Sequence, residues 1–426
     1  MPSEGKPTVS SCSFCGAPQS PQTPLIAGQN GYICEACVQC AHRVVSAWGS
    51  RRTIKQDAGR VLSPRSLKKS LDEYIIGQDA AKRVLSVAVF NHYQRLAALE
   101  RKWSDGEERV ELEKSNVLLF GPTGSGKTLL ARQLAKLVGV PFAVADATTL
   151  TQAGYVGEDV DTIVHRLLDA AGGDVSRAEW GIIYIDEIDK IARRSQGATG
   201  VRDISGEGVQ QALLKLVEGH RVSLPKQKGK ERDGRDYLDT ANILFIAGGA
   251  FGGLLESVSK RLGPEKRIGF GGPSNEGTKL LDALSHVENR DFKEYGFIPE
   301  FLGRFPVLAG LEELDTEALV RILREPKNAL TRQYQVLFAQ SGGTLDYSVS
   351  ALECVAQSAI DAGTGARGLR SVLEGALLST MFLLPFDTPT HCMLDCVDGT
   401  LRLQKSEGAA TPLAGARQDK EAAASG

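Results

Sequence analysis

The segment Gly121–Thr128 constrains the fold more than any other part of this sequence. It reads GPTGSGKT and matches the pattern G-x-x-x-x-G-K-[ST]. An apolar run, Val117–Phe120, precedes it, and Leu129–Val138 has the composition of a helix. In this strand–loop–helix context, glycines let successive backbone N–H groups point at phosphate oxygens, and the helix N-terminus favours the anion. We therefore predict a phosphate-binding loop in an α/β domain with a parallel sheet.

Two side chains of this loop are expected to work with a bound nucleotide. The ammonium group of Lys127 suits the β- and γ-phosphates, and the hydroxyl of Thr128 suits Mg²⁺. A glycine-rich turn without a ligand is the alternative, and the flanking strand and helix argue against it. The nucleotide-binding residues predicted here are Gly121, Pro122, Thr123, Gly124, Ser125, Gly126, Lys127, Thr128 and Leu129.

A second apolar strand ends in two carboxylates. Ile182–Ile185 is followed by Asp186 and Glu187. We expect Asp186 to hold Mg²⁺ together with Thr128, and Glu187 to polarise a water molecule, because neighbouring residues of a strand face opposite sides. The alternative is an acidic cap on the following helix. The two sites together predict Mg²⁺-dependent ATP hydrolysis in a doubly wound α/β domain.

The overall charge balance excludes a general attraction to polyanions. There are 50 Lys and Arg residues against 52 Asp and Glu residues, a formal net charge of -2. Nothing in that balance predicts binding to nucleic acid or to a membrane surface. The sequence also has neither an apolar secretory signal nor an apolar run long enough to span a bilayer. We expect a cytoplasmic protein whose cysteines are thiols or metal ligands.

Four cysteines near the N-terminus have the spacing of a zinc site. Cys12 and Cys15 form one C-x-x-C pair, and Cys34 and Cys37 form another. Two such pairs are typical of tetrahedral Zn²⁺ coordination, and a module this small needs a metal to fold. Unrelated thiols and a disulfide framework are the alternatives. The remaining cysteines lack ligand spacing and are expected to be structural or free: Cys40, Cys354, Cys392 and Cys396.

The chain divides into several predicted segments. They are a disordered N-terminus (1–11), a Cys₄ zinc module (12–48), a linker (49–65), a large nucleotide-binding domain (66–310), a smaller domain (311–405) and a disordered tail (406–426). Short apolar runs alternate with helical patterns in the large domain, which favours a parallel sheet. The smaller domain is expected to be mostly helical, with helices over 316–338, 348–360 and 368–384.

This combination of motifs resembles the ClpX family of AAA+ unfoldases, the ATP-binding subunits of Clp proteases. The resemblance runs from about Cys12 to Leu384. It implies an AAA+ domain with a parallel sheet, a small mostly helical C-terminal domain and an N-terminal zinc-binding module. Besides the motifs above, the stretches that carry it are Leu71–Gln78, Gly154–Gly157, Ser205–Gln211, Ile268–Phe270, Pro299–Arg304 and Gly365–Arg370.

The resemblance also implies roles for individual residues. Ile75 and Ile76 would border the adenine, and Tyr155 with Val156 would form a pore loop that grips polypeptide. A large aromatic side chain between glycines can hold many peptides through apolar area. A packed tyrosine at a loop end is the alternative for Tyr155. Arg304 would reach a neighbour's nucleotide and Arg367 would contact the γ-phosphate, although surface ion pairs are the commoner fate of arginine.

Partners follow from the same resemblance. Ile268, Gly269 and Phe270 match the tripeptide that docks on a separate serine-peptidase ring; a loop packed on the body is the alternative. This chain carries no G-x-S-x-G nucleophile motif, so another chain would have to cut. The implied assembly is a homo-hexamer that unfolds tagged or unfolded proteins, with adaptors, and translocates them to that peptidase.

The sequence departs from the family pattern in three places. The region Lys226–Asp236 lacks the family's Arg-Lys-His run at the axial entrance, the segment between Gly271 and His286 is short, and the match ends after Leu384. Other functions also compete: an AAA+ motor or loader on nucleic acid, a nucleotide-dependent scaffold that does not hydrolyse, and an unfoldase without a peptidase. The zinc module argues against the first, because Ala17–Tyr32 contains no Lys or Arg for phosphate contacts.

Overall fold

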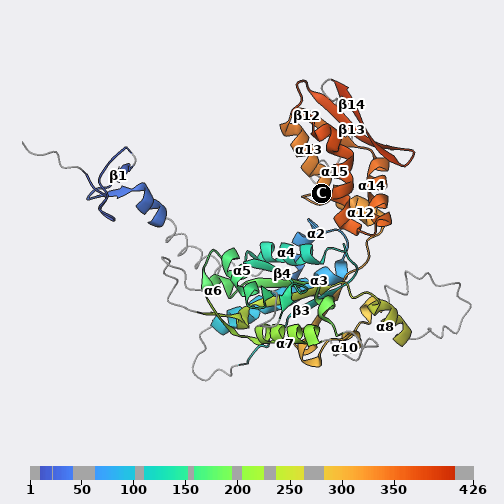
Figure 1. Cartoon of the computed structure of the whole chain (residues 1–426), viewed down its shortest axis with the longest axis horizontal. Helices are drawn as coiled ribbons and strands as arrows, with labels where there is room; N and C mark the ends of the chain where they lie inside the picture. The colour runs from blue at the N-terminus through green and yellow to red at the C-terminus, as the bar shows by residue number, and fades with distance from the viewer. Residues whose placement is uncertain are drawn as a thin grey trace, which may run out of the picture.

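The large domain is built on one five-stranded parallel sheet (Figure 1). The strand order is β11 (Val307–Gly310), β3 (Val117–Phe120), β10 (Leu244–Gly249), β7 (Ile182–Asp186), β4 (Phe142–Asp146). All four residues of β3 are buried, as expected for a parallel strand covered on both faces. The computed structural model describes residues 10–21, 23–41, 63–100, 110–151, 158–193, 204–224, 237–262 and 283–407.

Two apolar cores lie on the two faces of this sheet. Val117 and Leu119 of β3 face one core, and Leu118 and Phe120 face the other, as strand alternation requires. The first core contains α2 (Pro64–Asp72), α3 (Asp79–Glu100) and α4 (Lys127–Val138). The second contains α5 (Thr162–Ala170), α7 (Ile204–Glu218), α10 (Asn289–Tyr295) and α11 (Pro299–Gly303). Figure 1 shows α4 and α7 on opposite sides of the sheet.

Short elements complete the large domain. These are α6 (Val175–Ala178), α8 (Leu254–Leu262) and the 3-10 helices η1 (Ile188–Ile191) and η2 (Thr240–Asn242). Two strand pairs bracket segments outside the described residues. Parallel β5 (Leu150–Thr151) and β6 (Glu158–Asp159) flank 152–157, and antiparallel β8 (Arg221–Ser223) and β9 (Tyr237–Asp239) flank 225–236.

The small domain combines helices with a sheet that the sequence did not reveal. Its helices are α12 (Thr316–Arg324), α13 (Leu330–Gln340), α14 (Val349–Asp361) and α15 (Gly368–Met381). Its strands are β12 (Gly343–Tyr347), β13 (Thr390–Val397) and β14 (Thr400–Glu407), with β12 parallel and β14 antiparallel to β13. The domain is mostly helical, as predicted, but one continuous helix over 316–338 is wrong. Pro326 lies between α12 and α13, and proline cannot continue a helix.

The two domains are joined by specific contacts at residues 311–315 and beyond. The side chain of Gln78 donates to the carbonyl oxygen of Glu312 at 2.9 Å and accepts from its backbone N–H at 2.9 Å. The ammonium of Lys327 lies 2.6 Å from the carboxylate of Glu73, and the backbone N–H of Lys327 donates to the Glu73 carbonyl at 2.9 Å. The small domain is therefore tied to the segment between α2 and α3.

The N-terminal module contains a hairpin of β1 (Leu25–Ala27) and β2 (Tyr32–Cys34), followed by helical residues 35–41. Two predicted boundaries fall inside regular elements. Helix α2 begins at Pro64, capped by Ser63, within the predicted linker, and β14 runs to Glu407, into the predicted tail. No described helix is both long enough and apolar enough to cross a membrane.

Candidate functional site

The phosphate-binding loop connects β3 to α4 and is shaped by its glycines. Gly124 and Gly126 have φ angles of +82° and +97°, which side-chain-bearing residues rarely adopt. A Cβ on Gly124 would lie 2.8 Å from the carbonyl oxygen of Thr364 in the small domain. The loop can therefore approach the small domain this closely only because Gly124 has no side chain. Such a backbone cradle at a helix N-terminus fits a nucleotide phosphate.

Lys127 lies inside the loop and keeps its charge close to the cradle. Its ammonium donates to the carbonyl oxygens of Gly121 at 2.7 Å and Pro122 at 2.8 Å. Burial lowers the pKa of Lys127 to about 8; Asp186 opposes this shift and Arg367 adds to it. Two positive charges near a cradle of N–H groups are complementary to a polyphosphate.

Thr128 and Asp186 meet at the carboxyl ends of the strands. The Thr128 hydroxyl donates to the Asp186 carboxylate at 2.8 Å, although β10 lies between β3 and β7. The other predicted loop residues hold the turn. The Ser125 hydroxyl donates to the Pro122 carbonyl at 2.8 Å, Thr123 approaches Gly365, and Leu129 is half exposed on the first turn of α4. A hydroxyl beside a carboxylate is the donor set that Mg²⁺ uses in phosphate-binding loops, so the residues fit the ion.

Tyr184 is a member of this site that the sequence reasoning missed. Its hydroxyl donates to the Asp186 carboxylate at 3.2 Å. Burial raises the pKa of Tyr184, so the phenol remains a hydrogen-bond donor. A Cβ on Gly248 of β10 would collide with this hydroxyl. The sequence signal was Gly248 itself: a glycine near the end of the fully buried strand β10 indicates that a side chain of a neighbouring strand occupies the space beside it.

Glu187 is oriented differently from our expectation. Strand β7 ends at Asp186, so alternation along a strand does not separate the two carboxylates. Instead, Glu187 has a left-handed backbone, with φ +53° and ψ +33°, and precedes η1. Its N–H donates to the Asp186 carboxylate at 3.0 Å, and its side chain is exposed. A non-glycine residue in this conformation is uncommon and is often found at functional sites.

Arg367 and the two isoleucines predicted to border the adenine belong to different domains. Arg367 belongs to η3 (Gly365–Arg367) and is exposed; the preceding segment contacts Gly124, and the Arg367 charge acts on Lys127. Ile75 and Ile76 follow α2 and are almost fully buried. The small domain thus contributes a positive charge to a site built on the large domain.

Arg304 lies at a different place. It ends α11, where its guanidinium forms an ion pair with Glu218 of α7 at 2.7 Å and its carbonyl accepts from the Asn116 amide at 2.8 Å. The structure therefore brings Arg367, but not Arg304, to the phosphate-binding loop of the same chain.

The remaining predicted site residues lie outside the described residues. Tyr155 and Val156 belong to 152–157, between β5 and β6. Ile268, Gly269 and Phe270 belong to the segment 263–282 after α8.

The four predicted zinc ligands form one cluster. The sulfur atoms of Cys12, Cys15, Cys34 and Cys37 all lie within 4.8 Å of one another, and those of Cys15 and Cys34 are 3.6 Å apart. A tetrahedron with Zn–S bonds of roughly 2.3 Å needs about 3.8 Å between sulfurs. Backbone hydrogen bonds, the largest from Cys15, lower the pKa of Cys12 to about 6, whereas hydrogen bonds with Cys15 and Cys34 raise the pKa of Cys37, so without a metal the clustered sulfurs share protons. The donor set fits a structural Zn²⁺ ion, as predicted.

Comparison with protein families finds three matching segments. Residues 10–47 match the ClpX C4-type zinc finger, residues 112–308 match the AAA domain of the Cdc48 subfamily, and residues 314–389 match the C-terminal D2-small domain of ClpB. The predicted fold class is therefore confirmed in all three parts.

Curated relatives extend the similarity over almost the whole chain. The ATP-dependent Clp protease ATP-binding subunit ClpX of Azotobacter vinelandii is 56% identical over 392 residues, 91% of this chain and 89% of that protein. The subunit named ClpX 3 of Methylococcus capsulatus is 50% identical over 97% of this chain and all of its own length. The ClpX subunit of Treponema denticola is 48% identical over 88% of this chain and 90% of its own. With this similarity added to its zinc cluster and phosphate-binding loop, the chain belongs to the ClpX family of AAA+ proteins.

Proposed function

We propose that this protein is an ATP-driven unfoldase that pulls polypeptides through a ring and delivers them to a Clp-type peptidase. The observation that carries the proposal is the 2.8 Å contact of Thr128 with Asp186, beside Lys127 and Arg367 from two different domains. A site shared between domains can convert the state of its nucleotide into relative domain movement. The family to which the chain belongs supports the same reading, since its curated members are named ATP-binding subunits of Clp protease.

Each residue of the site has a proposed task. Lys127 and the N–H groups of the loop hold phosphates, Thr128 and Asp186 hold Mg²⁺, and Glu187 accepts a proton from the attacking water. Tyr184 orients Asp186 through its 3.2 Å hydrogen bond. Mg²⁺ and ATP, when bound, supply charge neutralisation and the phosphoanhydride bond. Because Ile75 and Ile76 are buried, the backbone of that segment is the part we expect to border the adenine.

We propose a ring of identical subunits, with six as the expected number, because it would explain why Arg304 lies away from the phosphate-binding loop of its own chain. Its guanidinium pairs with Glu218 instead of entering the phosphate-binding loop of its own chain. The pair is half exposed, and such pairs are worth roughly 0–1 kcal/mol, so Arg304 can exchange this partner at low cost. We propose that it reaches the nucleotide of a neighbouring copy.

Substrate and peptidase contacts are proposed for the two segments outside the described residues. Tyr155 and Val156 would grip tagged or unfolded proteins, including those brought by adaptors. Ile268, Gly269 and Phe270 would dock on a serine-peptidase ring. The zinc module would deliver substrate or support assembly. None of the eight cysteines is in a disulfide, and four of them form the proposed Zn²⁺ site, as expected of a protein in a reducing compartment such as the cytoplasm.

The central experiment measures degradation of a folded, tagged fluorescent reporter. We expect loss of fluorescence with ATP alone and loss of the polypeptide only when a Clp-type peptidase ring is added. Stimulation of ATPase activity by casein, but not by duplex DNA, would separate an unfoldase from a nucleic-acid motor. Stimulation by DNA alone, or an unchanged reporter in the presence of ATP and peptidase, would refute the proposal.

A further inference from the structure

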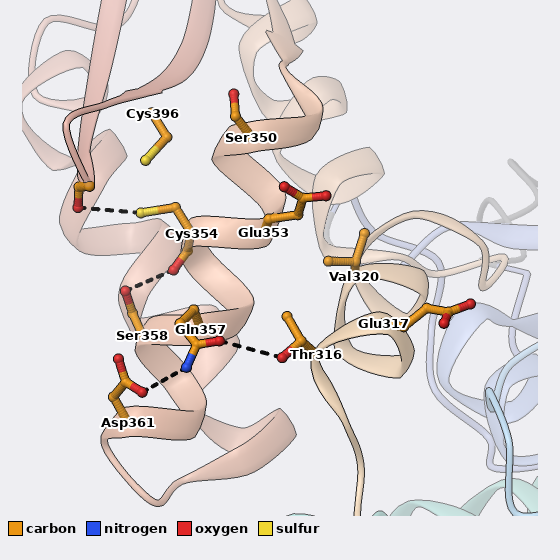
Figure 2. A pocket seen from close by; sticks show the side chains of 11 residues that line it. Thr316, Glu317, Val320, Ser350, Glu353, Cys354, Gln357, Ser358, Asp361 and Cys396 are labelled. Atoms are coloured by element: carbon orange, nitrogen blue, oxygen red, sulfur yellow. Dashed lines mark hydrogen bonds between the residues drawn. The ribbon is translucent and has the colours of Figure 1, made fainter.

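Two cysteines from distant parts of the small domain meet beside an open cavity (Figure 2). Cys354 lies on α14 and Cys396 lies near the end of β13. Cys392, Leu394 and Cys396 alternate onto the same face of β13, and the first two are buried in the core, so this face looks toward the helices. Figure 2 shows the two thiols pointing toward each other. Burial, followed by a hydrogen bond with the Cys396 thiol, raises the pKa of Cys354.

The two elements are already held together on both sides of this pair. The hydroxyls of Ser348 and Ser350, at the start of α14, donate to the Asp395 carboxylate at 2.5 Å and 2.9 Å. On the other side of Cys396, the Gly399 carbonyl accepts a hydrogen bond from the Cys354 thiol itself at 3.5 Å, a contact that a bond between the two sulfurs would replace. Because Asp395 and Gly399 flank Cys396, the backbone of the hairpin is fixed against α14. A bond between the two sulfurs needs little backbone movement.

The cavity gives a small oxidant access to both thiols. It has a volume of about 790 Å³, and both cysteines line it and are partly exposed. Cys392 is fully buried and does not line it. Glu317, Glu353 and Asp361 add negative charge, and none of the described lining residues is Lys, Arg or His. An uncharged oxidant is therefore favoured over an anionic disulfide.

We propose that Cys354 and Cys396 are a modification site, a dithiol that peroxide converts reversibly to an intramolecular disulfide. Because the pKa of Cys354 is raised, the first step is assigned to Cys396: its thiolate attacks a peroxide oxygen, the O–O bond breaks, and a sulfenic acid and hydroxide form. The second thiolate attacks that sulfur, the S–S bond forms, the S–O bond breaks, and a second hydroxide leaves. The two thiol protons convert both hydroxides to water, so two electrons pass from the thiols to one peroxide. A dithiol reductant returns both cysteines to thiols.

The test uses the full chain with zinc bound and a titration with hydrogen peroxide. After alkylation and trypsin digestion, we expect peptide 333–367, with Cys354, to be linked to peptide 371–402, with Cys396. The linked pair should be two hydrogens lighter than the two peptides and should vanish on reduction. An equal mixture of light and isotope-labelled chains should give no mixed pairs, because the bond is intramolecular. Oxidised glutathione at equal concentration should give at least several-fold less product.

Variants assign the bond to one cysteine of peptide 371–402. Cys396→Ser and Cys354→Ser should abolish the linked pair, and Cys392→Ala should retain it. Three results would overturn the proposal: both thiols still alkylated after peroxide treatment, a link that survives Cys396→Ser, or mixed-isotope pairs. A higher yield with oxidised glutathione would overturn the assignment of peroxide as the oxidant.

Discussion

At the scale of single residues, Glu187 stands out because it has a left-handed backbone conformation, which is uncommon for a residue other than glycine. Its φ of +53° places the carboxylate outside β7, while Asp186 remains at the strand end. The two acids therefore serve two positions without depending on strand alternation. Holding a non-glycine residue there costs roughly 1–3 kcal/mol, which the surrounding fold must offset.

Replacing Glu187 by Gln should separate binding from hydrolysis. The amide keeps the size of the side chain but cannot accept a proton, so ATP turnover should fall about 10²–10⁴-fold. ATP affinity, measured by calorimetry, should change by less than threefold. Glu256→Gln on the exposed face of α8 is the matched control and should turn over normally. Normal turnover in Glu187→Gln would exclude Glu187 as the base.

The pKa of Lys127 predicts how nucleotide affinity depends on pH. Burial lowers this pKa to about 8, and a bound phosphate anion would raise it again. Binding therefore favours the protonated form of Lys127. ATP affinity is highest well below pH 8 and weakens as the pH rises through 8. We expect ATP affinity to be about tenfold weaker at pH 9 than at pH 7.

Calorimetry in two buffers of different ionisation enthalpy tests this linkage, because binding near pH 8.5 should take up most of one proton. Equal affinity at pH 7 and pH 9 without proton uptake would show that Lys127 is already charged in the free protein throughout this range.

At the scale of elements, two glycines at opposite ends of α4 form a natural comparison. Gly124 and Gly139 have similar φ angles, +82° and +78°. A Cβ on Gly124 would meet the Thr364 carbonyl at 2.8 Å, whereas a Cβ on Gly139 meets nothing within 4 Å. Both changes to Ala add backbone strain of about 1 kcal/mol, but only one pushes the loop against the small domain.

We therefore expect Gly124→Ala to reduce ATP turnover at least tenfold and Gly139→Ala to change it less than twofold. Thermal unfolding should show a similar loss of stability in both variants. Equal loss of turnover in the two variants would mean that backbone strain, and not contact with Thr364, controls the loop.

The zinc module should depend on its metal while the nucleotide site does not. Metal analysis of the full chain should find about one Zn²⁺ per chain. Removal by a chelator should make residues 10–41 sensitive to protease, because so small a module lacks a sufficient core. Basal ATPase activity should stay within twofold. Protease resistance of this region after complete metal removal would contradict a structural zinc.

Much of the large domain could be predicted because its motifs are local. The apolar run of β3 directly precedes the glycine loop, and that of β7 directly precedes the acidic pair. Each motif could therefore be assigned to the end of a buried strand from neighbouring residues alone. The small-domain sheet could not be found this way, since β12 pairs with β13 across more than 40 residues. The left-handed turn at Glu187 and the Arg304–Glu218 pair also depend on distant packing. The break at Pro326, in contrast, was visible in the sequence.

At the scale of the whole molecule, translocation and peptidase docking should be separable. Tyr155→Ala should reduce unfolding of a stable tagged reporter at least tenfold while basal ATPase persists, because only the gripping surface is removed. Phe270→Ala should leave unfolding intact and abolish degradation, since the proposed ring would repeat each weak apolar contact in every subunit.

Pelleting or light scattering with the peptidase ring measures docking directly. Retained docking in Phe270→Ala would show that Phe270 is not the docking residue, whereas no docking by the unsubstituted protein would leave an unfoldase without a peptidase as the better function. A parallel fall of unfolding and ATPase in Tyr155→Ala would mean that Tyr155 packs within the fold.

The double hydrogen bond of Gln78 to Glu312 has a mechanical consequence. It holds Glu312 against the large domain, and α12 begins at Thr316, so residues 313–315 alone connect the two and span at most about 10 Å. With so short a connection, the small domain can rotate about Glu312 but cannot translate far from the large domain. The Lys327–Glu73 contact adds a second tie between the domains: the exposed ion pair contributes no more than about 1 kcal/mol, and the backbone N–H of Lys327 also donates to the Glu73 carbonyl at 2.9 Å. Such a connection would restrict the movement of the small domain relative to the large domain to a rotation about Glu312.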